Sequence, residues 1–222
     1  MTDPFTVYCD IRGRMVDLAR SSDADALATT VPSCPDWSVL QLLTHCVSMP
    51  VAIGAGDMPG DDLQGWIDRV LAERDGRSLG QLVDEWESAD PVIEAMVSGP
   101  GGVLLDDLMI HEHDLRGALG RPDHSAFEAD VFVDRALRSF VPALDTRDLG
   151  AIEIRHGSRS WRSHDADIGW IIEASPWEAV RVLASRRTAD EIRDLGGSED
   201  LDSYIALVDD HLPLPTASLG EH

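Results

Sequence analysis

Residues 103–119 read VLLDDLMIHEHDLRGAL, a segment with helical spacing that is followed by a glycine and a proline. On a helical wheel at about 100° per residue, one broad face is apolar. Its residues are Val103, Leu104, Leu108, Ile110, Leu115, Ala118 and Leu119. Asp107, His111 and Asp114 lie in the middle of that face. Because buried charges are costly unless they are paired or bind a cation, these three residues are the first candidates for a functional site.

Asp107 and His111 are one helical turn apart, so their side chains can converge on one metal ion. A third ligand is predicted at His45, which borders the apolar stripe of a helix predicted over 38–52. Each assignment has an alternative: a buried acid–imidazole bridge for Asp107 and His111, and a core histidine for His45. Asp114 is predicted to support the ligands rather than to bind the ion.

The opposite side of the same helix is predicted to face solvent. Its residues are Asp106, Glu112, His113 and Arg116. His113 is therefore only a substitute candidate for a metal ligand.

The composition excludes several classes of function. The chain has 222 residues, 43 % of them hydrophobic, and its 18 basic and 41 acidic side chains give a formal net charge of −23. Such a surface repels nucleic acids and anionic membranes, so neither is an expected partner. All the basic residues are arginine, which excludes lysine-based chemistry such as a Schiff base.

Cysteine usage and the N-terminal residues indicate a cytoplasmic protein. Cys9, Cys34 and Cys46 are odd in number and lack CxxC spacing, which fits a reducing compartment. The first residues carry an acid where a signal peptide is basic, and no run approaches the ~18 apolar residues of a membrane span. None of the cysteines is a predicted nucleophile, because Cys34 has no basic neighbour in the sequence and Cys46 faces an apolar stripe.

The whole chain predicts an α+β fold that is mainly α. Helices are expected over 5–20, 38–52, 63–74, 78–97, 103–119 and 127–144, with a proline-rich connector at 31–37. Alternating runs predict strands at 151–157, 159–165 and 168–174. Capping-box patterns occur at Ser38, Ser78, Ser175 and Thr188. We therefore expect a helical bundle over residues 1–122 and a small α+β domain over 123–222.

Three segments resemble one known family. VPSCPDWSVLQLLTHC (31–46) and DDLMIHEHDLRGALGRP (106–122) are similar to the signature segments of the mycothiol-dependent maleylpyruvate isomerase family. WEAVRVLASRRTADEI (177–192) is similar to the end of that family's small C-terminal domain. The family belongs to the DinB/YfiT-like superfamily of metal-binding four-helix bundles. The resemblance thus implies a DinB-like four-helix bundle with a small α+β domain after it.

The resemblance also implies a set of site residues. In the family, one histidine and an acid-x-x-x-histidine pair bind a divalent metal, usually zinc, and these match His45, Asp107 and His111. The family's acid is usually glutamate, so Asp107 is a departure. Arg186 matches an arginine that reaches the active site and contacts the cofactor, with Arg187 as its substitute; alternatively both are solvated at a helix end. Trp37 also follows the family pattern, although it equally suits a core position.

The implied function is metal-dependent thiol chemistry. An ion with three protein ligands keeps an open position, which in the family accepts mycothiol, a small thiol of actinobacteria. The expected reaction is isomerisation of an unsaturated acid or S-transfer to an electrophilic small molecule, with Arg186 and Asp114 as catalytic residues. One alternative is a non-catalytic DinB-like module that has lost its metal or uses it structurally. Another is a hydrolase with Asp114 as general base.

Overall fold

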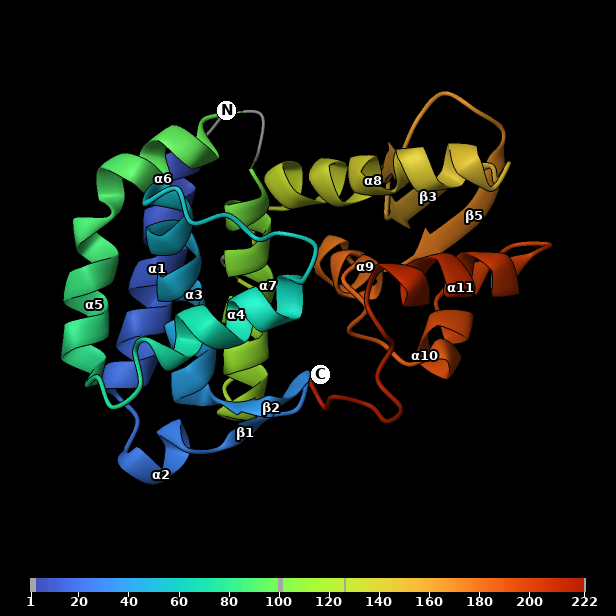
Figure 1. Ribbon diagram of the computed structural model, residues 1–222. Helices are drawn as coiled ribbons and strands as arrows, with labels where there is room; N and C mark the ends of the chain where they lie inside the picture. Colours follow the sequence, from blue (N-terminus) through green and yellow to red (C-terminus); the bar gives the residue numbers. More distant parts are fainter. Residues whose placement is uncertain (1–2, 100–101, 126, 222) are drawn as a thin grey trace. The chain divides into compact units, whose positions relative to one another are not determined.

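The structure, a computed structural model, describes residues 3–99, 102–125 and 127–221. It is mostly helical (57 %) and has a small mixed sheet, which confirms the α+β class with helices dominant. The chain divides into two compact units: the first ends at Pro122 but also includes Glu221, and the second begins at Asp123 and runs to Gly220 (Figure 1). Among the described residues, no helix is long and apolar enough to cross a membrane.

The first unit is built around helix α7. Its elements are α1 (Pro4–Arg20), α2 (Ala24–Leu27), β1 (Thr30–Val31), β2 (Cys34–Ser38), α3 (Val39–Gly54), α4 (Leu63–Ala72), α5 (Leu79–Ser88), α6 (Asp90–Val97) and α7 (Val103–Ala118). Helix α7 packs against α1, α3, α6 and β1, and α3 packs in addition against α4 and α5 (Figure 1). The two helices that carry the predicted metal ligands, α3 and α7, are therefore direct neighbours.

Capping boxes fix where two of these helices begin, as predicted. At α3, the Ser38 amide donates to Gln41 Oε1 at 2.9 Å, and the Gln41 amide donates to Ser38 Oγ at 3.3 Å. Ser78 and Gln81 form the same reciprocal pair at the start of α5. Because the box defines the first turn of α3, it also sets the direction in which His45 points two turns later.

Residues 31–37 were predicted as a connector, which is wrong. Strands β1 and β2 pair antiparallel, with Val31 opposite Cys34 and Thr30 opposite Ser38. The Val39 amide also donates to the Thr29 carbonyl at 2.9 Å. A proline after Cys34 confines that residue to extended backbone, which suits a short strand at the edge of a ladder.

The single helix predicted over 78–97 is two helices, α5 and α6, separated at Ala89. Pro91 has no amide hydrogen to donate to the carbonyl four residues earlier, and its ring collides with that carbonyl. The helix therefore ends and a new one begins with the proline in its first turn.

The solvent face predicted for residues 103–119 is also wrong, because Glu112, His113 and Arg116 are buried. Packing by four neighbouring elements leaves α7 without a free polar side. Arg14 of α1 donates from Nε and Nη2 to the two Glu112 oxygens at 2.7 and 2.6 Å. Arg116 Nε donates to Glu112 Oε1 at 3.0 Å. The buried carboxylate is thus satisfied by two arginines.

The second unit combines a four-stranded mixed sheet with helices. Its elements are α8 (Ala129–Thr146), β3 (Ala151–His156), β4 (Arg159–Arg162), β5 (Ile168–Glu173), α9 (Pro176–Leu183), α10 (Ala189–Asp194), β6 (Gly196–Gly197) and α11 (Leu201–His211). The strand order is β4-β3-β5-β6, and only β3 and β5 are parallel. Helix α8 packs against α9, β3 and β4, over a core that contains Ile152, Ile154, Trp170 and Ile172.

The two capping patterns of the second unit have different outcomes. Thr188 and Glu191 form the complete box at α10. At α9, Ser175 Oγ accepts from the Glu178 amide at 3.2 Å, but the Glu178 carboxylate bonds Arg187 instead of closing the box. A stronger charged partner replaces the local amide donor.

The buried ion pair of α7 generates a stability prediction. Replacing Glu112 by alanine leaves Arg116 buried without its carboxylate, so the Glu112→Ala variant should lose about 3–5 kcal/mol of unfolding free energy. The exposed Glu87→Ala variant is the matched control and should change it by less than about 0.5 kcal/mol. Urea unfolding followed by circular dichroism measures both values. Equal midpoints for the two variants would contradict the structural role of Glu112.

Candidate metal centre

The structure brings His45, Asp107 and His111 together. His45 lies on α3, and one turn of α7 presents Asp107 and His111 toward it. His45 Nε2 is 3.5 Å from Asp107 Oδ2, and His111 Nε2 is 3.3 Å from Asp107 Oδ1. One ligand atom from each residue lies within 4.8 Å of those of the other two, so the group could hold a metal ion.

The spacing of these atoms is compatible with zinc, and each of the two imidazole nitrogens faces a different oxygen of Asp107. Two ligand atoms bound tetrahedrally to zinc at about 2.0–2.2 Å lie about 3.3–3.5 Å from each other. The two nitrogen–oxygen separations in the site are 3.3 and 3.5 Å. A good N–H···O hydrogen bond is shorter, about 2.7–3.2 Å. The residues therefore fit the ion that the resemblance implies.

His45 is deeply buried and lies against an aromatic ring. The His45 side chain is 5 % exposed, and its Nδ1 has no hydrogen-bond partner among the described residues. The unpartnered atom is Nδ1, whereas Nε2 is the atom that faces Asp107, so coordination through Nε2 would leave the desolvation cost of Nδ1 in place. The ring also lies against Trp37, with ring centroids 4.8 Å apart.

The electrostatics of the site favour a positive charge beside Asp107. Burial by itself would raise the pKa of Asp107, but the His111 and His45 imidazoles lower it well below its ordinary range. For His111, burial favours the neutral ring, whereas Asp107 and, to a smaller extent, Asp114 raise the pKa from 6.5 to about 9. A proton on His111 thus neutralises the carboxylate when no metal does.

Access to the site is from the Asp107 side. The Asp107 side chain is 30 % exposed, while those of His45 and His111 are 5 % and 8 % exposed. Asp107 is therefore the residue of the group that is most accessible to solvent. Catalytic metal sites keep a position open for water or substrate, so a ligand residue that is accessible to solvent is compatible with one.

Asp114 contacts the second ring nitrogen of His111, and its role in supporting a metal ligand stays a prediction. Its carboxylate Oδ2 lies 3.0 Å from His111 Nδ1, and its side chain is fully buried. Such a contact fixes the orientation of a ligand imidazole and leaves Nε2 free to coordinate. The same burial argues against Asp114 as a general base, because it does not reach solvent.

Cys34 is a site residue that the sequence reasoning missed. It was set aside for lack of a basic neighbour, but its Sγ lies within 4.8 Å of a ring nitrogen of His111 and a carboxylate oxygen of Asp114. The proximity follows from the packing of the β1–β2 hairpin, which sequence periodicity does not reveal. Cys46, by contrast, is buried as predicted, and burial raises its pKa well above the ordinary value.

Arg186 and Arg187 are both buried, so the alternative of two solvated residues at a helix end is wrong. Arg187 pairs with both oxygens of Glu178 and lies over the Trp177 ring, with 5.2 Å between its Cζ and the ring centroid. Arg186 Nη1 donates to the Ala184 carbonyl at 2.9 Å. Contact of either arginine with a cofactor stays a prediction.

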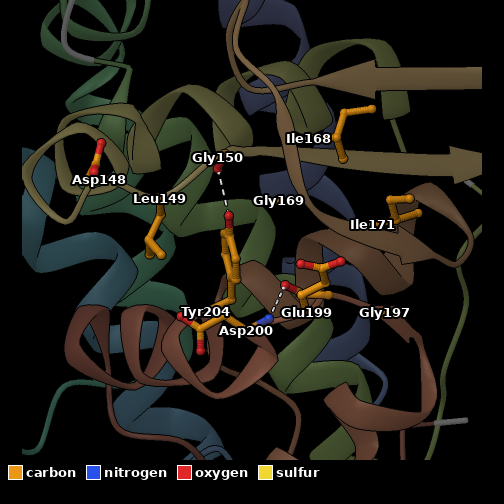
Figure 2. A pocket seen from close by; sticks show the side chains of 11 residues that line it. Asp148, Leu149, Gly150, Ile168, Gly169, Ile171, Gly197, Glu199, Asp200 and Tyr204 are labelled. Carbon is orange, nitrogen blue, oxygen red and sulfur yellow. Dashed lines mark hydrogen bonds between the residues drawn. The ribbon is translucent and has the colours of Figure 1, made fainter.

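The second unit also contains a pocket of about 570 Å³. Figure 2 shows the Tyr204 side chain crossing it toward Gly150, whose carbonyl accepts a hydrogen bond from the Tyr204 hydroxyl at 3.0 Å. Its acidic lining residues are Asp148, Glu199 and Asp200. None of the predicted site residues lines this pocket.

Comparisons with known proteins found no match for this chain. This holds for protein-family models, for curated proteins and for solved structures. The likeness to mycothiol-dependent enzymes accordingly depends on residues 31–46, 106–122 and 177–192 alone, and the site is interpreted from its own geometry.

The first prediction from the site concerns metal content. We expect the purified protein to bind about one zinc ion tightly through this group. Removing one ligand in His45→Ala, Asp107→Ala or His111→Ala should weaken zinc binding by about 100-fold or more. His156→Ala, which changes an exposed histidine, is the control and should bind normally. Competition with a chromophoric chelator measures the affinities, and equal affinity of His156→Ala and His111→Ala would refute this site.

The raised pKa of His111 predicts how the stability of the metal-free protein depends on pH. The folded protein keeps the His111 proton up to about pH 9, whereas the unfolded chain loses it near 6.5. The stabilisation is therefore complete below pH 6.5 and is lost as the pH rises through about 9; it amounts to about 2–3 kcal/mol. Urea unfolding in a chelator at pH 6 and 9.5 measures this loss. A His111→Gln variant with the same pH dependence would contradict the assignment.

Proposed function

We propose that this chain is a metal- and mycothiol-dependent isomerase or S-transferase built on a DinB-like four-helix bundle. The observation that carries the proposal is the placement of two imidazole Nε2 atoms at 3.3 and 3.5 Å from one partly exposed carboxylate. Three ligands from two adjacent helices leave room for a further one. Zinc bound there would lower the pKa of a coordinated thiol and make it nucleophilic at neutral pH.

Each residue of the site has a separate role in the proposed reaction. Asp107 and His111 come from one turn of α7, so their separation is set before an ion binds, and His45 completes the group from α3. Asp114 holds the His111 ring through Nδ1. Trp37 covers His45 and keeps water from its face. Arg186 is proposed to orient a carboxylate of the thiol cofactor or of the substrate, with Arg187 as the less suitable candidate because it is committed to Glu178.

The substrate class proposed is an unsaturated acid or another small electrophile. A thiolate that adds to an activated double bond allows rotation about it and then leaves, which isomerises the substrate. Displacement of a leaving group by the same thiolate is S-transfer. Both reactions use an external thiol, and neither uses Cys9 or Cys46, which lie outside the group of ligands.

One observation favours a different function. Asp107 is a methylene shorter than the glutamate usual in the family, and a DinB-like module that holds its metal only for stability would tolerate this change. Such a module would bind zinc and resist unfolding but would not turn over any electrophile. The difference between the two functions is therefore a matter of turnover, not of metal content.

A thiol-dependence assay distinguishes these functions. The zinc-loaded protein is incubated with a panel of unsaturated acids and electrophiles, with and without mycothiol. We expect turnover only with the thiol, a loss of about 100-fold or more in His111→Ala, and unchanged turnover in His156→Ala. Turnover without any thiol would indicate a hydrolase instead. No turnover by a protein that holds its zinc would favour the structural module.

A further inference from the structure

The two ring nitrogens of His111 face two different groups of residues. Nε2 faces Asp107 at 3.3 Å, on the side where His45 lies. Nδ1 faces Asp114 Oδ2 at 3.0 Å. The proposed zinc site uses only the first of these groups. The second group consists of Cys34, His111 and Asp114. Each offers one ligand atom, which for Cys34 is Sγ, and these atoms lie within 4.8 Å of one another.

The position of Cys34 is fixed by the backbone around it. The residue pairs with Val31 in the β1–β2 hairpin, and β1 packs directly on α7. Pro35 restricts Cys34 to an extended conformation. The Ser38 capping box then joins the hairpin to α3 without a flexible linker. The position of Sγ on this backbone depends on one side-chain torsion of Cys34, and Ser33 Oγ lies 3.9 Å from the sulfur.

The three donor atoms are of the elements that a thiophilic ion prefers, and their separations are close to those of a zinc site. Zinc binds thiolate at about 2.3 Å and imidazole at about 2.0–2.1 Å, which puts sulfur and nitrogen about 3.6 Å apart in a tetrahedral site. The separations of Cys34 Sγ from the other two ligand atoms, at most 4.8 Å, shorten to that value with a movement of about 1 Å. His111 Nδ1 and Asp114 Oδ2, at the hydrogen-bond distance of 3.0 Å, would move apart to about 3.4 Å. Cys34 is half-buried and Asp114 fully buried, so Cys34 is the more accessible of these two residues.

We propose that Cys34, His111 and Asp114 form a second ion site, on the Nδ1 side of the His111 ring, that selects thiophilic ions. Zn²⁺, Cd²⁺ and Co²⁺ are the ions it takes, and the hard ions Mg²⁺ and Ca²⁺ are excluded by the sulfur and nitrogen donors. Binding releases the Cys34 thiol proton and any proton on His111 Nδ1 to solvent, with no change of oxidation state. The site is linked to the proposed function only through His111, which both ion positions share.

Cobalt titration tests the proposal because a thiolate bound to Co²⁺ gives a strong charge-transfer band in the near ultraviolet. The full-length protein at Co²⁺ saturation should show this band, and Cys34→Ser should lose it. Cys9→Ser is the matched control, since Cys9 is also half-buried but lies outside both groups, and should keep the band. Cd²⁺ binding by Cys34→Ser and by Asp114→Asn should weaken about 10- to 100-fold at this site. Circular dichroism of each variant establishes that it is folded.

The first ion position is tested separately with His45→Ala, which leaves the second group intact. We expect His45→Ala to retain the thiolate–cobalt band while binding one ion fewer than the unmodified protein. A saturated protein without the band, or a band that persists in Cys34→Ser, would overturn the second site. A third outcome separates the two proposals: the band depends on Cys34, but His45→Ala binds as many ions as the unmodified protein. This result would count against the proposed function and would support the second site.

Discussion

Helix α7 buries several ionisable side chains, and the packing of the first unit has to provide partners for them. His111, Glu112 and Asp114 are all buried, and each would cost several kcal/mol without a partner. Some of these partners lie on α7 itself, where Asp107 and Asp114 face His111. Others come from neighbouring elements: Arg14 of α1 binds Glu112, and His45 of α3 faces Asp107. The helices are therefore positioned by charge satisfaction as well as by apolar packing.

Two of the acidic residues of α7, Glu112 and Asp107, are satisfied in different ways. Glu112 receives short, charge-assisted hydrogen bonds from two arginines and is closed to solvent. Asp107 is more exposed, and its imidazole partners lie at the longer distances of 3.3 and 3.5 Å. Arginine cannot give up its proton at physiological pH, whereas histidine can. The Glu112 group is consequently fixed, and the Asp107 group can exchange a proton for a metal ion.

Sequence reasoning reached the part of this arrangement that depends on helical periodicity. The spacing of Asp107 and His111 showed that they share a face, and the capping box at Ser38 located the helix of His45. Sequence reasoning failed where contacts between distant segments determine which side chains are buried. Glu112 looked solvated because the wheel contains no information about Arg14, which comes from a helix about a hundred positions earlier. Cys34 looked inert because its neighbour His111 is remote in the sequence.

The division of the ligands between α3 and α7 has a mechanical consequence. Asp107 and His111 form a chelate on one rigid helix, but His45 is separated from them by about sixty residues of chain. An ion bound to all three would join the ends of that long loop as a reversible cross-link. In the loop-entropy picture, a covalent link of this span would restrict the unfolded chain by about 4 kcal/mol. The loop includes α4, α5 and α6, so their hydrogen-exchange rates would report whether the cross-link is in place.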